Sequence, residues 1–147
     1  MRFVVSMETF SRETFQSELD PWYVTGFIEA QGTFTFSRNG RQMALYFGIK
    51  LPEVDEPVLH SIREFFGGVG SIYPVQAGAS AYFRVCRREQ LPVIVEHVDT
   101  YPLRSSKRAV YEIWREMVVL KQSFRRPPRE ELWQLAEQLS AATGRSH

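Results

Sequence analysis

The feature that most constrains this chain is the stretch from Asp20 to Phe34, DPWYVTGFIEAQGTF. Asp20 is a favourable N-cap and Pro21 suits the first position of a helix, so the sequence predicts a helix that begins here. Gly32 is a natural C′ residue, which would end this helix after about ten residues. Strand-forming residues follow directly, so polar groups are expected where a helix meets a sheet.

Inside this helix, Gly26 and Ala30 are four residues apart and therefore lie on one face. A glycine in the middle of a helix costs roughly 1 kcal/mol relative to alanine, so its presence needs a physical reason. The close approach of another backbone is the reason we favour.

The stretch from Val24 to Gly32 resembles the LAGLIDADG nonapeptide of homing endonucleases, position for position. A second stretch from Tyr101 to Lys107, followed by Trp114, is similar to the later "YPL-T-K" segment of that family and its helix. The resemblance extends from about Leu19 to Leu120, which is most of the chain.

The resemblance implies a site-specific double-stranded DNA homing endonuclease, which hydrolyses phosphodiester bonds with Mg²⁺ and leaves short 3′ overhangs. The eighth motif residue of the family is an acidic metal ligand, whereas this chain has Gln31. Gln31 and Ala30 occupy the implied metal position, and Gln31, Lys107 and Lys50 are the implied catalytic residues. Mg²⁺ favours anionic oxygen ligands, so we expect impaired cleavage.

Three explanations of Gln31 remain open at this point. The chain is an engineered Glu-to-Gln variant, a natural descendant kept as an inactive DNA-binding protein or RNA-splicing maturase, or an enzyme in which Glu29 binds the metal. The last is disfavoured because Glu29 points elsewhere on the helix, and the sixth motif position usually caps or orients structure. Lys107 likewise has an alternative role, as a lysine at a helix start that contacts the DNA backbone.

Hydrophobic periodicity predicts two strand pairs and four further helices. The first pair turns at Asn39-Gly40, so that Phe36 lies opposite Met43 and Phe34 opposite Leu45. The other expected segments are a helix at 53–66, strands at 70–75 and 80–88, and helices at 91–98, 106–121 and around 132–139. This order is an α+β fold with one antiparallel sheet and helices on one face. It is also the αββαββα order of the LAGLIDADG core, whose sheet is saddle-shaped.

The outward faces of both strand pairs carry polar side chains that suit base edges in the major groove, and arginines near loops and helix ends suit phosphates. The candidate DNA-binding residues are Thr33, Thr35, Ser37, Arg38, Asn39, Arg41, Gln42, Tyr46, Ser71, Tyr73, Tyr82, Arg84, Arg88, Arg104 and Arg108.

A single copy of the motif predicts a homodimer on a long, near-palindromic DNA site, joined through Trp22, Gly26, Glu29 and Ala30. The 147 residues suit one core domain at 20–122, with an N-terminal arm at 1–19 and a C-terminal linker and helix at 123–147. The net charge of +1 gives no global attraction to nucleic acid, so any DNA surface must be local. No apolar run is long enough to cross a membrane, and we expect an intracellular protein.

Overall fold

The computed structural model describes residues 19–75 and 78–144, so the expected N-terminal arm lies outside the described residues apart from Leu19. The helices are α2 (Pro21–Gln31), α3 (Glu56–Phe65), α4 (Leu91–Thr100), α5 (Lys107–Ser123) and α6 (Arg129–Ala142), with a short 3₁₀ turn at Glu53–Asp55. The strands are β1 (Gly32–Asn39), β2 (Gln42–Pro52), β3 (Ser71–Val75) and β4 (Ser80–Val85).

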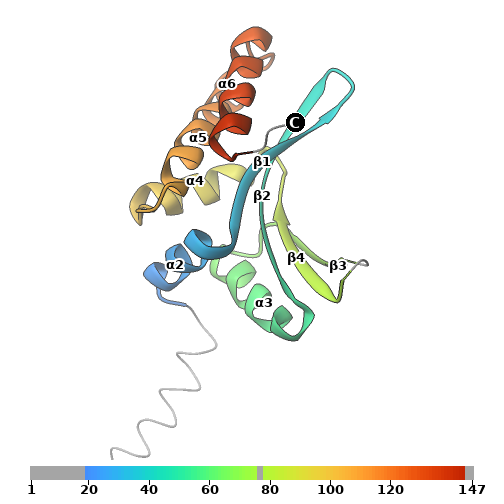
Figure 1. Ribbon diagram of the computed structural model, residues 1–147, viewed down its shortest axis with the longest axis vertical. Helices are drawn as coiled ribbons and strands as arrows, with labels where there is room; N and C mark the ends of the chain where they lie inside the picture. Colours follow the sequence, from blue (N-terminus) through green and yellow to red (C-terminus); the bar gives the residue numbers. More distant parts are fainter. Residues whose placement is uncertain (1–18, 76–77, 145–147) are drawn as a thin grey trace, which may run out of the picture.

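The four strands form one antiparallel sheet in the order β1-β2-β4-β3. Figure 1 shows a strongly curved sheet, with α4, α5 and α6 gathered on one side of it. Helix α5 contacts β1 and β2, and α6 packs on α5. The predicted α+β class and its antiparallel sheet are therefore confirmed.

The core lies between the sheet and the helices, as the strand periodicity predicts. In β4 the side chains of Ala81, Phe83 and Val85 are fully buried, whereas the alternate residues are partly exposed. The indole of Trp114 on α5 is also fully buried, and its Nε1 donates a hydrogen bond to the Thr35 carbonyl at 3.0 Å. This bond ties the long helix to the first strand.

The first hairpin turns one residue later than the sequence predicts. Its turn residues are Gly40 and Arg41, so Phe36 lies opposite Leu45 and Phe34 opposite Phe47. Of these two turn residues only Gly40 has a positive φ, +63°, which is the pattern of a type II′ turn with glycine first. The partner of each residue shifts by two positions, so the predicted apolar face is kept.

The second strand pair is also shorter than predicted, because β4 ends at Val85. Arg88 therefore lies beyond the sheet and not on its outward face. Its guanidinium donates hydrogen bonds to the carbonyls of Lys121, at 2.9 Å, and Gln122, at 3.3 Å. The side chain thus satisfies carbonyl groups at the end of α5.

Candidate functional site

The junction between α2 and β1 is the centre of the candidate site. Asp20 caps the helix as predicted, accepting a hydrogen bond from the Trp22 amide at 2.8 Å. The helix ends before Gly32, also as predicted, but Gly32 is extended, with φ −77° and ψ 150°. A Cβ at Gly32 would lie 2.8 Å from both Cγ2 and the carbonyl oxygen of Ile28. Glycine is required here by close contact with the preceding turn and not by a left-handed backbone.

Lys107, the first residue of α5, reaches this junction from 75 residues away. Its Nζ donates hydrogen bonds to the carbonyl oxygens of Gly32, at 2.6 Å, and Ile28, at 3.2 Å. Desolvation lowers the pKa of Lys107, against the opposing effect of the Glu29 carboxylate. The ammonium therefore caps the C-terminal end of α2, a role that neither sequence-based alternative anticipates.

Glu29 makes the reciprocal connection from α2 to the loop before α5. Its carboxylate accepts hydrogen bonds from the amides of Arg104, at 2.9 Å, and Ser105, at 3.1 Å, and from the Ser105 hydroxyl at 3.2 Å. Desolvation raises the pKa of Glu29, but these hydrogen bonds outweigh it and the net pKa is lowered. Glu29 thus orients structure, as the sixth motif position implies.

Gln31 and Lys50 lie at the same end of the sheet. Gln31 is the exposed last residue of α2, and Lys50 is exposed on β2 next to Ile49, which pairs with Gly32. Lys107 is directed to the carbonyls on either side of Gln31 in the chain. All three predicted catalytic residues therefore meet at one end of the sheet.

This junction does not fit a divalent metal ion within one chain. Gln31 and the carbonyl of Ala30 offer neutral oxygens, whereas the nearby Glu29 carboxylate is already engaged by the 104–105 loop. Among residues 19–75 and 78–144, no group of three His, Cys, Asp or Glu side chains could hold a metal ion. Mg²⁺ sites normally include anionic oxygen ligands, which are lacking here.

On the outward sheet face, Arg84 is held among aromatic rings. Its guanidinium carbon lies 4.0 Å from the ring centroid of Tyr46, in a cation–π arrangement. Desolvation lowers the pKa of Arg84, but a hydrogen bond with Tyr73 leaves it raised overall. Tyr82 covers Gly48 on this face, since a Cβ at Gly48 would collide with its ring. Arg84 is therefore partly buried against the aromatic side chains of this face.

The other candidate DNA-binding residues divide by exposure. The exposed residues are Thr33, Arg38, Asn39, Arg41, Gln42, Ser71, Arg104 and Arg108, and Ser37 is half-buried. Thr35 is only 3% exposed, so its expected place on the accessible face is wrong. Arg38 stacks on Trp133 of α6, with 4.5 Å from guanidinium carbon to ring centroid, and Arg108 pairs with Glu112 at 3.3 Å.

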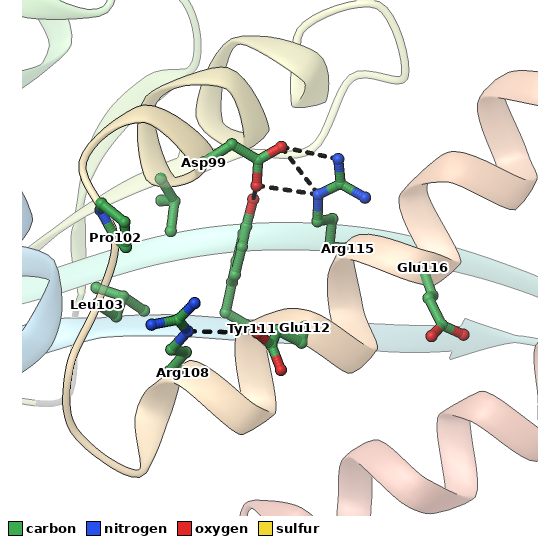
Figure 2. A pocket seen from close by; sticks show the side chains of 9 residues that line it. Asp99, Pro102, Leu103, Arg108, Tyr111, Glu112, Arg115 and Glu116 are labelled. Carbon is green, nitrogen blue, oxygen red and sulfur yellow. Dashed lines mark hydrogen bonds and ion pairs between the residues drawn. The ribbon is translucent and has the colours of Figure 1, made fainter.

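Two polar clusters among the helices have no counterpart in the sequence-based predictions. Figure 2 shows Arg115 and Tyr111 directed at Asp99. All three residues line a pocket of ≈ 460 Å³. The Tyr111 hydroxyl donates to Asp99 at 2.7 Å, and an Arg115 nitrogen lies 2.8 Å from the same carboxylate. The second cluster joins His97 to Thr25 at 3.0 Å. Both clusters link residues distant in the sequence, so no local motif could reveal them.

The outer side of α2 is available for a partner. Trp22 is 52% exposed and Tyr23 is 48% exposed, and Gly26 and Ala30 are exposed beside them. A Cβ at Gly26 would have no other atom within 4 Å, so nothing in the described part of the chain explains this glycine.

The sequence model of the LAGLIDADG endonuclease family matches residues 24–118. The chain belongs to the LAGLIDADG endonuclease family. Members of this family are DNA endonucleases that generally use a divalent metal ion. No helix among the described residues of this LAGLIDADG protein is long and apolar enough to cross a membrane.

Two curated relatives come from fungi. A protein in ND4 intron 1 of Podospora anserina is 35% identical over an alignment of 113 residues that covers 71% of this chain and 25% of that protein. A probable intron-encoded endonuclease of Neurospora crassa is 26% identical over 76% of this chain and 22% of its own length. The chain therefore spans about a quarter of the length of each of these curated relatives.

Solved LAGLIDADG structures share the fold. The meganuclease I-AabMI bound to uncleaved DNA has a TM-score of 0.74 and 30% identity, with 80% of this chain and 44% of that chain covered. The homing endonuclease I-TnaI has the same TM-score of 0.74 at 23% identity, with 86% of this chain and 97% of that chain covered, and so supports the fold alone.

Proposed function

We propose that this chain binds double-stranded DNA through the outward face of its sheet, and that it cleaves this DNA weakly or not at all. The observation that carries the second part is the junction at Gln31, where a neutral amide stands in the position of the family's acidic ligand. The reaction implied by the family is Mg²⁺-dependent hydrolysis that leaves short 3′ overhangs.

The polar surface around Arg84 supports DNA binding. Arginine offers donors that pair with a guanine edge in the major groove, and its stack on Tyr46 reduces the conformational entropy lost on binding. The similar meganuclease I-AabMI was solved bound to uncleaved DNA. Binding inside the cell, where genomic DNA is present, follows from the same proposal.

We further propose that two copies join through α2 and together bind a near-palindromic site. The exposed Trp22 and Tyr23 and the unoccupied space at Gly26 support a partner helix on this face. A symmetric dimer would place the same strand-face residues over both halves of the DNA, which makes the preferred site symmetric. Glu29 and Ala30, the other predicted interface residues, follow at helical spacing on this face of α2 or next to it.

The loss of charge at Gln31 supports impaired cleavage. The amide keeps the shape of a glutamate and one acceptor oxygen, but it lacks the negative charge that attracts a divalent cation. Glu29 is a poor substitute ligand, because its carboxylate already accepts hydrogen bonds from the 104–105 loop.

The test is to restore the carboxylate with Gln31→Glu. A preferred site is first selected from a randomised duplex library with the unaltered chain and then placed in a plasmid. We expect Gln31→Glu to cut this plasmid with Mg²⁺ much faster than the unaltered chain, while affinity changes far less than rate. Gln31→Met is the uncharged control and should remain inactive.

Three outcomes would change the proposal. Strong Mg²⁺-dependent cutting by the unaltered chain would show that another group holds the metal, with Glu29 tested first. No cutting by Gln31→Glu at a well-bound site would indicate a DNA-binding protein that has lost its chemistry elsewhere as well. Failure to select any duplex would overturn the DNA-binding function itself.

A further inference from the structure

Part of β2 has an edge that none of the described strands covers. β2 pairs with β1 from Gln42 onward but with β4 only from Phe47 onward, so residues 42–46 have no β4 partner. Natural proteins protect such edges with charged side chains or with a covering segment. Here Lys121 donates a hydrogen bond to the Met43 carbonyl, and Arg129 Nη2 donates to the Arg41 carbonyl at 3.4 Å.

This covering leaves a strongly basic pocket of ≈ 440 Å³ between the hairpin and the connection from α5 to α6. Five cationic side chains line it, and no Asp or Glu does: Arg41, Lys121, Arg125, Arg126 and Arg129. Trp133 also contributes to its wall. We call this cavity the hairpin pocket.

The exposed charges of the hairpin pocket have no acidic ion-pair partner among the described residues. Arg41, Arg125 and Arg126 are exposed, and none of them takes part in an ion pair between described residues. Desolvation lowers the pKa of Lys121, and repulsion from nearby Arg88 lowers it further. Because the whole chain carries only +1, this gathering of like charges is local and attracts an anion.

The position of the pocket indicates which anion it meets. Figure 1 shows the tip of the β1–β2 hairpin and the α5–α6 connection at one end of the molecule, with α2 toward the other. Strand residues rise about 3.3 Å each, so the tip lies roughly 25 Å from the end of α2. At about 3.4 Å per base pair, this distance corresponds to roughly seven or eight base pairs from a dimer axis at α2.

We propose that the hairpin pocket binds backbone phosphates of duplex DNA flanking the bases that the sheet contacts. This inference rests on the proposed DNA-binding function. Guanidinium groups bind phosphate oxygens with paired hydrogen bonds, and Arg41, Arg125 and Arg126 have theirs available. Arg125, Arg126 and Arg129 follow the end of the family match at residue 118, so they extend the DNA contact beyond the matched core.

The experiment compares salt dependence of binding. The affinity of the unaltered chain for a 30-base-pair duplex of mixed sequence is measured between about 50 and 200 mM NaCl. In the variant Arg125→Ala with Arg126→Ala, two phosphate contacts are lost, so the slope of log K against log [NaCl] should fall in magnitude by about 1.8. The charge-keeping control is Arg125→Lys with Arg126→Lys, which should retain the slope.

A second measurement locates the contact. On the selected site, ethylation of phosphates about eight base pairs from the centre should weaken binding by the unaltered chain and not by the double alanine variant. An unchanged slope in that variant, with DNA binding otherwise retained, would overturn the hairpin pocket alone. If the double alanine variant shows a smaller salt slope with single-stranded RNA of the same length and not with duplex DNA, the proposal for the hairpin pocket is also overturned. No duplex binding by the unaltered chain would overturn both proposals.

Discussion

The ammonium of Lys107 donates a hydrogen bond to the backbone carbonyl of Gly32, with an Nζ–O distance of 2.6 Å. In the opposite direction, the carboxylate of Glu29 on α2 accepts hydrogen bonds from the amides of Arg104 and Ser105, which precede α5. Two long-range connections of opposite charge therefore fix α2 to the start of α5. This arrangement explains why the motif and the YPL segment occur together in the fold.

Removal of the Lys107 ammonium should destabilise the fold. Lys107→Met keeps the length of the side chain but leaves the Ile28 and Gly32 carbonyls without their charged donor. Hydrogen bonds from a charged group contribute about 1.5–3 kcal/mol, and partial exposure reduces this, so we expect a loss of about 1–2 kcal/mol in the free energy of unfolding. Urea denaturation measures it.

Lys50→Met is the matched control for that change. Lys50 is exposed at the same end of the sheet, and no hydrogen bond or ion pair of its side chain is found among the described residues. Its replacement should change stability by less than about 0.5 kcal/mol. Equal effects of the two substitutions would contradict a capping role for Lys107.

His97 should make stability depend on pH. Its imidazole is 7% exposed, and the Thr25 hydroxyl, which donates to the Tyr101 carbonyl at 2.9 Å, accepts a hydrogen bond from Nε2–H. Burial lowers the pKa of His97 from 6.5 to about 4. The unfolded chain therefore takes up a proton near pH 6.5 that the folded chain resists, so stability falls as pH decreases from 6.5 toward 4.

The size of this effect follows from the same pKa values. At about 1.4 kcal/mol per pH unit, His97 should remove at most about 2 kcal/mol of stability between pH 7 and pH 5. His97→Gln keeps an N–H donor for Thr25 and does not titrate, so its urea midpoint should vary less over this range. The same variation in both proteins would assign the pH dependence to other groups.

Sequence patterns among neighbouring residues predicted the features that depend only on neighbouring residues, namely a helix start and the inward face of a strand. The start of α2 follows from Asp20 and Pro21, and the inward positions of Phe83 and Val85 follow from strand alternation. The hairpin register was wrong by two positions because both registers keep the same apolar face. The backbone of Asn39 distinguishes them: a type I′ turn at 39–40 would give it a positive φ, whereas it lies in β1 without one and pairs with Gln42.

The errors at the candidate site have a different cause. Thr35 alternates with apolar neighbours in the sequence, which predicts exposure, but tertiary packing buries it. The role of Lys107 depends on a contact across 75 residues, which no periodicity encodes. The meeting of Gln31, Lys50 and Lys107 was implied by the family resemblance and not by the spacing of these residues. Their DNA-binding and catalytic roles stay predictions.

The two glycines of the motif should respond to substitution in opposite ways. At Gly32 a Cβ would lie 2.8 Å from the Ile28 carbonyl oxygen, whereas at Gly26 it would meet no atom within 4 Å. Gly32→Ala should therefore destabilise each subunit. Gly26→Ala should stabilise the isolated subunit by up to about 1 kcal/mol, because alanine has the higher helix propensity.

Dimerisation should respond in the opposite way, with the substitution at Gly26 weakening it more than the substitution at Gly32. If a partner backbone approaches α2 at Gly26, Gly26→Leu should give a folded monomer in sedimentation velocity, whereas the folded fraction of Gly32→Ala should still dimerise. Circular dichroism separates a folded monomer from an unfolded chain. A dimer of undiminished affinity in Gly26→Leu would exclude this face as the interface. If the unaltered chain stays monomeric at tens of micromolar, the homodimer itself is contradicted.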